Sequence, residues 1–208
     1  MRHKTEHEAF WAGSFGDNYI DRNQGSRLLA VNLALFSTIL RRCIGVESVL
    51  ELGANVGMNL RALHALLPQA SLRGIEINEK AEAVLRDLPY VASERRSLLG
   101  YRAAEMADLV FTKTVLIHID PNHLSEAYAA LYENTRRYLL VAEYYNPSPV
   151  EVTYRGHQHR LFKRDFAGDL LKTYPDLQLV DYGFVYHGDQ FAQDDITWFL
   201  MEKEEGDV

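Results

Sequence analysis

The segment from Val49 to Leu60, with the sequence VLELGANVGMNL, constrains the fold more than any other part of the chain. Its first residues are typical of a buried strand, and Gly53 and Gly57 follow before a helical pattern begins. A strand that ends in a glycine turn and continues into a helix is the opening unit of an α/β sheet. We therefore expect this strand to end at the edge where open parallel sheets bind their ligands.

Strands and helices alternate along most of the remaining chain. Apolar runs bounded by polar or turn residues predict strands over 47–52, 71–77, 90–95, 107–112 and 138–145. Periodic apolar positions predict helices over 26–43, 57–67, 78–88, 121–136 and 165–174. Two strand-like segments, 177–187 and 196–203, have no helix between them and predict an antiparallel hairpin. The fold class is therefore α/β: a Rossmann-like seven-stranded, mostly parallel sheet with helices on both faces and a C-terminal antiparallel hairpin.

Length and composition fit one domain. A chain of 208 residues, 47% of them hydrophobic, can bury one core of ordinary size. We predict a single domain over 1–208, with an N-terminal lid segment at 1–26 and an acceptor-side insertion at 144–165. The oligomeric state is left open by the sequence.

Charge and cysteine usage exclude several classes of partner. The net charge is −7 and no long basic cluster is present, so we expect no nucleic-acid partner, because phosphate binding needs a Lys/Arg surface. Apolar runs stay below the roughly 18 residues of a membrane span, and no signal-peptide core precedes them, which predicts a cytoplasmic protein without a membrane partner. Cys43 stands alone, and His157 and His159 lack a third ligand, so we expect no metal.

The glycine turn has two interpretations. Gly53 and Gly57 serve either close packing of the helix on the sheet or the approach of a ligand to the backbone. Glu76 ends the second strand nineteen positions after Gly57, where nucleotide sites of this fold place the acid that binds the ribose hydroxyls. The alternative for Glu76 is a solvated carboxylate at a strand end. The two features together favour a nucleoside site.

The third glycine of a dinucleotide site is missing, and this favours a different ligand. Asn55 stands where the second glycine of that motif would be, and Glu51 precedes the turn. A carboxylate here would repel a pyrophosphate but would suit a ligand with a positive centre, such as S-adenosylmethionine with its sulfonium and ammonium groups. We expect Glu51, Gly53 and Asn55 to hold its amino-acid tail while Glu76 holds the ribose. A nicotinamide-dependent oxidoreductase is the less favoured alternative.

Three motifs in order resemble the class I S-adenosylmethionine-dependent methyltransferases. VLELGANVG is similar to their first motif, IEI to their second, and DLVFTKTVLIHI to their fourth-strand segment. The resemblance covers roughly residues 27–203 and implies S-adenosyl-L-methionine as cofactor and S-adenosyl-L-homocysteine (SAH) as product. It also implies that Ser97 and Leu98 contact adenine. The acid that is frequent at that position is absent from the segment RRSLLGY.

Three further segments resemble a smaller group, the methylases associated with pseudaminic acid biosynthesis. They are FWAGSFGDNYIDRN at 10–23, AEYYNPSPVEVTYRGH at 142–157 and LFKRDFAGDLL at 161–171. The resemblance implies a sialic-acid-like sugar or nucleotide sugar as acceptor. This implication rests on the genomic association with such sugars that gives the group its name. The expected function is thus methyl transfer to a small polar acceptor. A non-catalytic protein that binds S-adenosylmethionine or a nucleoside is the main alternative.

The N-terminal aromatic segment also has two interpretations. Its rings, among them Trp11, either pack a helix on the domain or belong to a lid over the cofactor. In the second case Tyr19 or Arg22 would meet the methionine carboxylate, because a guanidinium binds a carboxylate through two hydrogen bonds. We count Trp11, Ile77 and Thr112 among the candidate cofactor-binding residues as well.

Catalytic and acceptor-binding candidates follow the fourth and fifth strands. A base is needed only if the acceptor is a hydroxyl or a protonated amine, and our candidates are His118, Glu143 and Tyr144, in that order. Capping or packing is the alternative for His118. The long polar and aromatic segment after the fifth strand is the best acceptor site, although each of its residues alone could be surface decoration. The candidate substrate-binding residues are Tyr145, Asn146, Tyr154, Arg155, His157 and Arg164.

Overall fold

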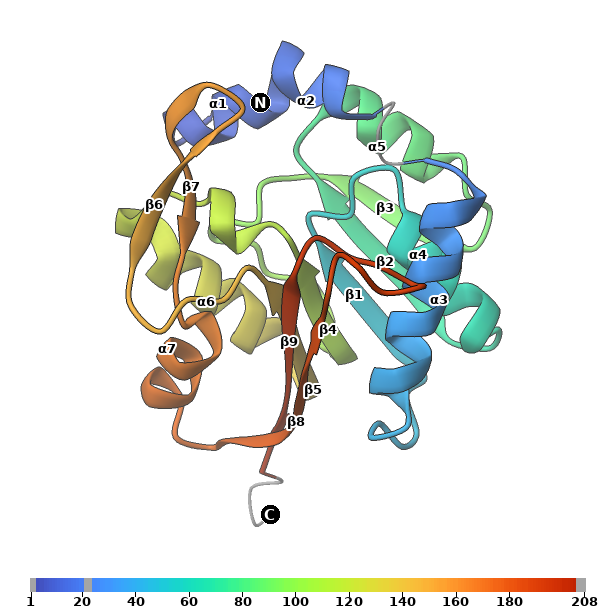
Figure 1. Ribbon diagram of the computed structural model, residues 1–208. Helices are drawn as coiled ribbons and strands as arrows, with labels where there is room; N and C mark the ends of the chain where they lie inside the picture. The colour runs from blue at the N-terminus through green and yellow to red at the C-terminus, as the bar shows by residue number, and fades with distance from the viewer. Residues whose placement is uncertain (1–2, 21–23, 205–208) are drawn as a thin grey trace.

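A seven-stranded sheet organises residues 3–20 and 24–204, the part of the chain that the computed structural model describes (Figure 1). The strand order is β3-β2-β1-β4-β5-β9-β8. Strands β1 to β5 pair in parallel, and β9 is antiparallel to both β5 and β8. The strands are β1 (Ser48–Leu52), β2 (Ser71–Glu76), β3 (Val91–Arg95), β4 (Ala107–Lys113), β5 (Thr135–Glu143), β8 (Leu177–Val185) and β9 (Ile196–Lys203). The predicted fold class is confirmed.

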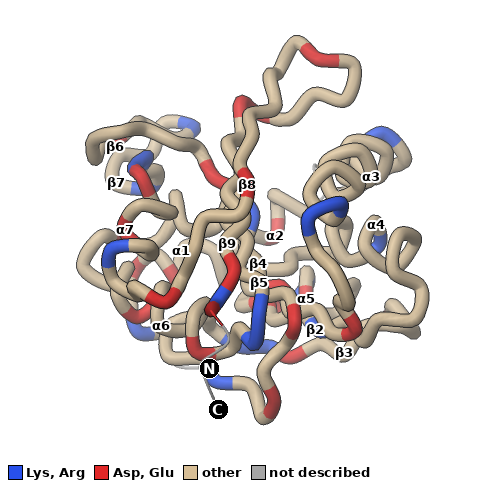
Figure 2. Tube along the Cα trace, turned by 90° about the horizontal axis from the view of Figure 1, so that it is seen from below, with Lys and Arg blue, Asp and Glu red and all other residues tan. Residues whose placement is uncertain are grey.

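Helices cover both faces of this sheet. Seen along the strands, α3 and α4 lie on one side, and α6 and α7 lie on the other (Figure 2). Phe36 and Leu63 pack on one face against Val49, and Leu131 and Phe166 belong to the core of the other face. The central strands are apolar on both faces because both are buried. The helices are α3 (Ser26–Leu40), α4 (Met58–Leu66), α5 (Glu79–Arg86), α6 (Leu124–Asn134) and α7 (Phe166–Thr173).

The junction before β5 differs from the prediction. The helix expected over 121–136 begins as a 3₁₀ turn, η2 (Pro121–His123), and α6 ends at Asn134. The strand starts at once, because the Asn134 side chain donates to the carbonyl of Ala130 and the Thr135 hydroxyl donates to that of Leu131. These side-chain bonds terminate the helix without a loop.

The insertion after β5 is more ordered than the sequence indicated. It contains a separate two-stranded antiparallel sheet, β6 (Val150–Tyr154) and β7 (His157–Lys163). Arg155 and Gly156 join the two strands with φ angles of 49° and 84°. Two residues with positive φ form the tight turn that matches the twist of a hairpin. The sequence does not predict these two strands because most of their residues are exposed, so apolar and polar positions do not alternate clearly.

The N-terminal segment folds into two short helices, α1 (Glu6–Ala12) and α2 (Ser14–Ile20). Thr5 and Glu8 begin α1 with a reciprocal capping box. A Cβ atom at Gly16 would lie 1.9 Å from the carbonyl oxygen of Trp11, so only glycine allows α2 to fold back so closely. Both helices lie above the carboxyl ends of the strands (Figure 1). The roles predicted for the segment 1–26 and for the insertion remain predictions, and Arg22 lies outside the described residues.

Among the residues that the structure describes, no helix is both long enough and apolar enough to cross a bilayer.

Candidate functional site

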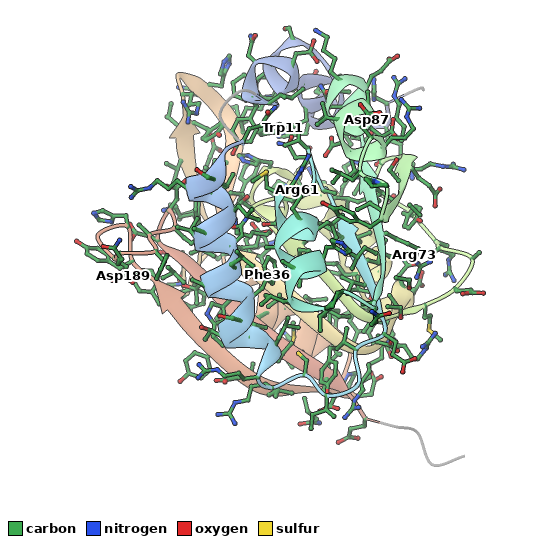
Figure 3. All side chains as sticks on the ribbon, turned by 90° about the vertical axis from the view of Figure 1, so that its right-hand side faces the viewer. Trp11, Phe36, Arg61, Arg73, Asp87 and Asp189 are labelled. Atoms are coloured by element: carbon green, nitrogen blue, oxygen red, sulfur yellow. The ribbon has the colours of Figure 1, made fainter. Side chains whose placement is uncertain are left out.

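A cavity lies between the carboxyl ends of the central strands and the two N-terminal helices. The turn at 53–55 and Glu76 form part of its floor, and His118 forms part of its wall. Trp11 and Tyr19 close it from α1 and α2. Trp11 extends below the N-terminal helices, on the side that faces the sheet (Figure 3). The cavity therefore occupies the edge of the sheet at which the sequence predicted a ligand.

The geometry of the glycine turn agrees with both interpretations, close packing and the approach of a ligand to the backbone. Gly53 has a φ of 85°, and a Cβ atom there would lie 2.6 Å from a methyl group of Val115, so packing alone requires glycine. Gly53 and Asn55 also line the cavity, and the Asn55 side-chain oxygen is buried without a hydrogen bond among the described residues. Gly57, by contrast, begins α4 away from the cavity wall, where a Cβ atom would lie 2.7 Å from Leu85.

Glu76 is held rigidly at the cavity. Its side chain is 9% exposed, and its two carboxylate oxygens accept the backbone N–H groups of Asn78 and Asn55, each at 2.8 Å. Burial raises the pKa of Glu76, and these backbone bonds oppose the shift. Each oxygen keeps a further lone pair for a ligand hydroxyl. Ile77 lines the cavity next to it.

Glu51 and Lys113 place two ionisable groups beside the turn. Glu51 is fully buried, accepts a 2.6 Å bond from the Asn59 amide, and leaves its second oxygen without a partner in the described structure. Burial raises the pKa of Glu51 to about 8. Lys113 ends β4 and lines the cavity, and its ammonium forms neither a hydrogen bond nor an ion pair with a described residue. Burial lowers the pKa of Lys113, whereas the nearby carboxylates oppose this. Thr112 lies beneath, with its hydroxyl bonded to the carbonyl of Leu52.

The far end of the cavity lies beyond β3. Ser97 and Leu98, the residues implied in adenine binding, both line it. The Ser97 hydroxyl donates to the carboxylate of Glu8, which comes from α1. The floor thus follows the strand ends in the order β4, β1, β2, β3.

His118 has the geometry of a neutral base. It is 6% exposed, and its ring lies 4.5 Å from that of Trp11 and 4.8 Å from that of Tyr154, measured between centroids. Its Nδ1 is 2.7 Å from the carbonyl oxygen of Arg160; a carbonyl can only accept, so Nδ1 carries the proton and Nε2 keeps a lone pair. Burial lowers the pKa of His118 to about 4, so the ring is neutral at pH 7.

The other two catalytic candidates lie away from the cavity wall. Glu143 is buried and accepts the backbone N–H groups of Val115 and Leu116 at 2.9 and 3.0 Å. It therefore fixes the start of η1 (Leu116–His118), the turn that carries His118. Burial raises the pKa of Glu143 to about 7, against these backbone bonds. The hydroxyl of Tyr144 is 3.5 Å from Asp194.

The six candidate substrate-binding residues fall into two groups, and all six lie outside the cavity wall. Tyr154, Arg155 and His157 lie near the turn of the β6–β7 hairpin, where the His157 ring contacts Phe10. The second group lies farther along the segment, away from the hairpin turn. Tyr145 packs on Phe199, Asn146 bonds the carbonyl of Ser148, and Arg164 is 3.7 Å from Asp169.

Three further residues shape the site. Asn78 caps α5 and also donates to the carbonyl of Trp11 and to Asp17, so it ties both N-terminal helices to the floor. A polar residue that follows an apolar strand is a signal that could have identified Asn78 and Lys113. Glu8 has no such local signal, because its contact with Ser97 spans 89 residues of sequence. No group of three or more metal-ligating side chains occurs among residues 3–20 and 24–204.

Comparison with known proteins supports the fold. No family model and no curated protein sequence matches the chain. Magnesium protoporphyrin IX methyltransferase from Synechocystis PCC 6803, solved with SAH, is similar with a TM-score of 0.69 and 14% identity over 95% of this chain and 97% of that one. The plantazolicin methyltransferase BpumL, solved with SAH and a pentazolic desmethylPZN analogue, has a TM-score of 0.66 and 13% identity over 96% of this chain and 95% of that one. A putative S-adenosylmethionine-dependent methyltransferase from Listeria monocytogenes gives 0.62 and 14% over 85% and 99%. At these identities the similarity establishes the fold.

Proposed function

We propose that the protein transfers a methyl group from S-adenosylmethionine to a small acceptor. One observation carries the proposal. The rigidly held carboxylate of Glu76, which can accept ribose hydroxyls, lies in the same cavity as buried polar atoms that have no hydrogen-bond partner. Among the described residues, the Asn55 oxygen and the indole nitrogen of Trp11 are such atoms on residues that line the cavity, and Glu51, which is bonded to the lining residue Asn59, carries a third. Buried polar groups are nearly always hydrogen-bonded, so atoms of this kind in a cavity wall indicate a ligand.

The charges along the floor fit this cofactor. Glu76 would accept the two ribose hydroxyls, and Glu51 would face the ammonium of the tail. Lys113 lines the same end of the cavity and would pair with the tail carboxylate, the role that the sequence predicts for Tyr19 or Arg22. An ammonium and a carboxylate together match this pair of opposite charges, whereas a pyrophosphate matches only one of them.

Bound S-adenosylmethionine would supply an electrophilic methyl group. The protein's own contribution is to position the acceptor, exclude water and take up a proton where the acceptor loses one. His118 is placed for the last of these, because its Nε2 accepts while Arg160 holds its Nδ1–H. Glu143 acts as a positioning residue, because it holds the turn that carries His118. The rings of Trp11 and Tyr154 shield His118 from water.

Acceptor identity is the finer part of the proposal. The resemblance of residues 10–23 and 142–171 to the pseudaminic-acid-associated methylases makes sialic-acid-like sugars and nucleotide sugars the first acceptors to test. Two polar side chains lie at the tip of the β6–β7 hairpin: Arg155 over the ring of Tyr154, and His157 against Phe15. Their chemistry suits a hydroxylated or acidic acceptor.

The test begins with calorimetric titration of SAH, with NAD as the comparison ligand. We expect micromolar binding of SAH and none of NAD, because the tail ammonium of SAH can pair with an ionised Glu51, whereas a pyrophosphate offers that carboxyl no cation. Product formation from S-adenosylmethionine is then followed by mass spectrometry over a panel of sugars, nucleotide sugars and small amines. Folded protein that does not bind SAH would overturn the proposal. Binding without product from any acceptor would favour a non-catalytic binding protein.

A further inference from the structure

Among the described residues, the segment after β3 contributes no acid to the base end of the cavity. Residues after Glu76 lead to β3 and then to Arg96, Ser97 and Leu98, all on the cavity wall. A nucleoside whose ribose is held by Glu76 and whose tail lies over β1 must direct its base toward this end, because β3 is the next strand in the sheet. Glu94, the nearest acid in sequence, is exposed and bonded to Tyr101.

Glu8 fills this gap from another part of the chain. It is 6% exposed and lines the cavity beside Ser97. One of its oxygens accepts the Ser97 hydroxyl, and the other accepts the backbone N–H groups of Lys4 and Thr5. The ammonium of Lys4 points elsewhere, to Glu126 and to the carbonyl of Leu99.

The chemistry of Glu8 calls for a donor from a ligand. No described cation lies within ion-pair distance of its carboxylate, although burying a charge is costly unless it is paired and hydrogen-bonded. The oxygen that faces Ser97 accepts one hydrogen bond and has room for a second. Adenine presents an exocyclic amine, which donates, whereas hypoxanthine presents a carbonyl oxygen at the same place, which a carboxylate repels.

We propose that Glu8 recognises the exocyclic amine of adenine, so that the N-terminal helix α1 supplies the base-specific contact of the cofactor site. The inference rests on the proposed function, because it assumes that the cavity binds an adenosine. It has a mechanical consequence. Since Glu8 and Trp11 belong to the same helix, α1, adenine binding would hold this helix closed over the site.

The test compares SAH with S-inosylhomocysteine, in which the amine is replaced by a carbonyl oxygen, by calorimetry. The wild type should prefer SAH strongly, and Glu8→Gln should reduce this preference by about 10-fold or more, because a charged acceptor is lost and an amide can also donate. Glutamine is accepted in a capping box, so α1 should keep its cap. The matched control is Glu6→Gln on the same helix, whose side chain is 91% exposed, and it should leave the preference unchanged.

A measurement on the wild type removes dependence on the variant's folding. At equal saturation, SAH should slow amide hydrogen exchange in α1 more than S-inosylhomocysteine does. Equal protection by the two ligands, or an unchanged preference in folded Glu8→Gln that still binds SAH, would overturn the role of Glu8 and leave the proposed function standing. Failure of the wild type to bind SAH would overturn both.

Discussion

The floor of the cavity is made from residues at the ends of neighbouring strands, whereas its roof joins segments that are far apart in the chain. The floor, with Gly53, Asn55 and Glu76, is fixed by the backbone bond from Gly53 N–H to the Ile75 carbonyl and by the backbone N–H groups that the Glu76 carboxylate accepts. The roof consists of α1 and α2, with the β6–β7 hairpin packed behind them, and it is held by side-chain contacts such as that of His7 with the carbonyl of His159. A segment opens at a lower free-energy cost where its opening breaks few backbone hydrogen bonds of a sheet. The floor is therefore suited to hold the cofactor and the roof to admit and position the ligands.

The largest effect should come from the roof and wall, at His118. If His118 accepts the acceptor's proton, His118→Ala should lower turnover by about 10²- to 10⁴-fold, with SAH affinity nearly unchanged. His123→Ala is the control, because His123 is partly exposed and pairs with Glu126 away from the cavity. Near-normal turnover in His118→Ala would mean that positioning alone drives the reaction.

The pH profile sharpens the same prediction. A base must be neutral to act, and the pKa of His118 is lowered to about 4. Turnover should therefore persist as the pH falls below the ordinary histidine value of 6.5 and should be lost only as it passes through about 4, provided that the protein stays folded. An acid limb near 6.5 would contradict the assignment of His118.

The next effect concerns the floor at Glu76. Loss of hydrogen bonds from a charged acceptor should cost about 1.5–3 kcal/mol, which corresponds to roughly 10- to 150-fold in Kd. Glu76→Ala should therefore weaken SAH binding, measured by calorimetry on protein whose fold is checked by circular dichroism. Gly53→Val, which would fill the ligand's place, is a poorer test, because the new side chain would also collide with Val115. A Kd within about twofold of wild type would show that Glu76 merely ends a strand.

A smaller effect should mark Lys113. If its ammonium pairs with the tail carboxylate, Lys113→Met should weaken SAH binding by about 10-fold. The decarboxylated analogue of S-adenosylmethionine should bind equally well to wild type and variant. Lys163→Met is the matched control, because its ammonium lies over the ring of Tyr144 and outside the cavity wall. Equal losses for both ligands would contradict the pairing.

The smallest effect is a proton linked to binding at Glu51. Its pKa is raised from 4.5 to about 8, so the free protein holds a proton there at pH 7. A ligand ammonium favours the charged carboxylate, so binding should release this proton, and affinity should fall as the pH decreases below about 8. Calorimetry in buffers of different ionisation enthalpy measures the release, and Glu51→Gln should abolish it. The same shift makes the free protein less stable as the pH rises from 4.5 to about 8.

The difference between floor and roof also explains which site residues the sequence could predict. Gly53 and Glu76 were predictable, because a glycine turn and an acid after an apolar strand are local patterns whose place at the sheet edge follows from the fold. Glu143 has a different position from the one expected of a base, because the backbone N–H groups that it accepts belong to another strand's loop. Glu8 and the hairpin contacts could not be predicted, since they depend on how distant segments pack.

The most direct test of the account is a crystal structure of the protein with SAH. We expect the ribose hydroxyls on Glu76, the ammonium beside Glu51 and the base beyond β3 with its amine at Glu8. His118 should lie on the same side as the sulfur atom, with its Nε2 facing the space left for an acceptor. SAH bound outside this cavity, or bound in it with its base over β4 and its tail over β3, would contradict the account.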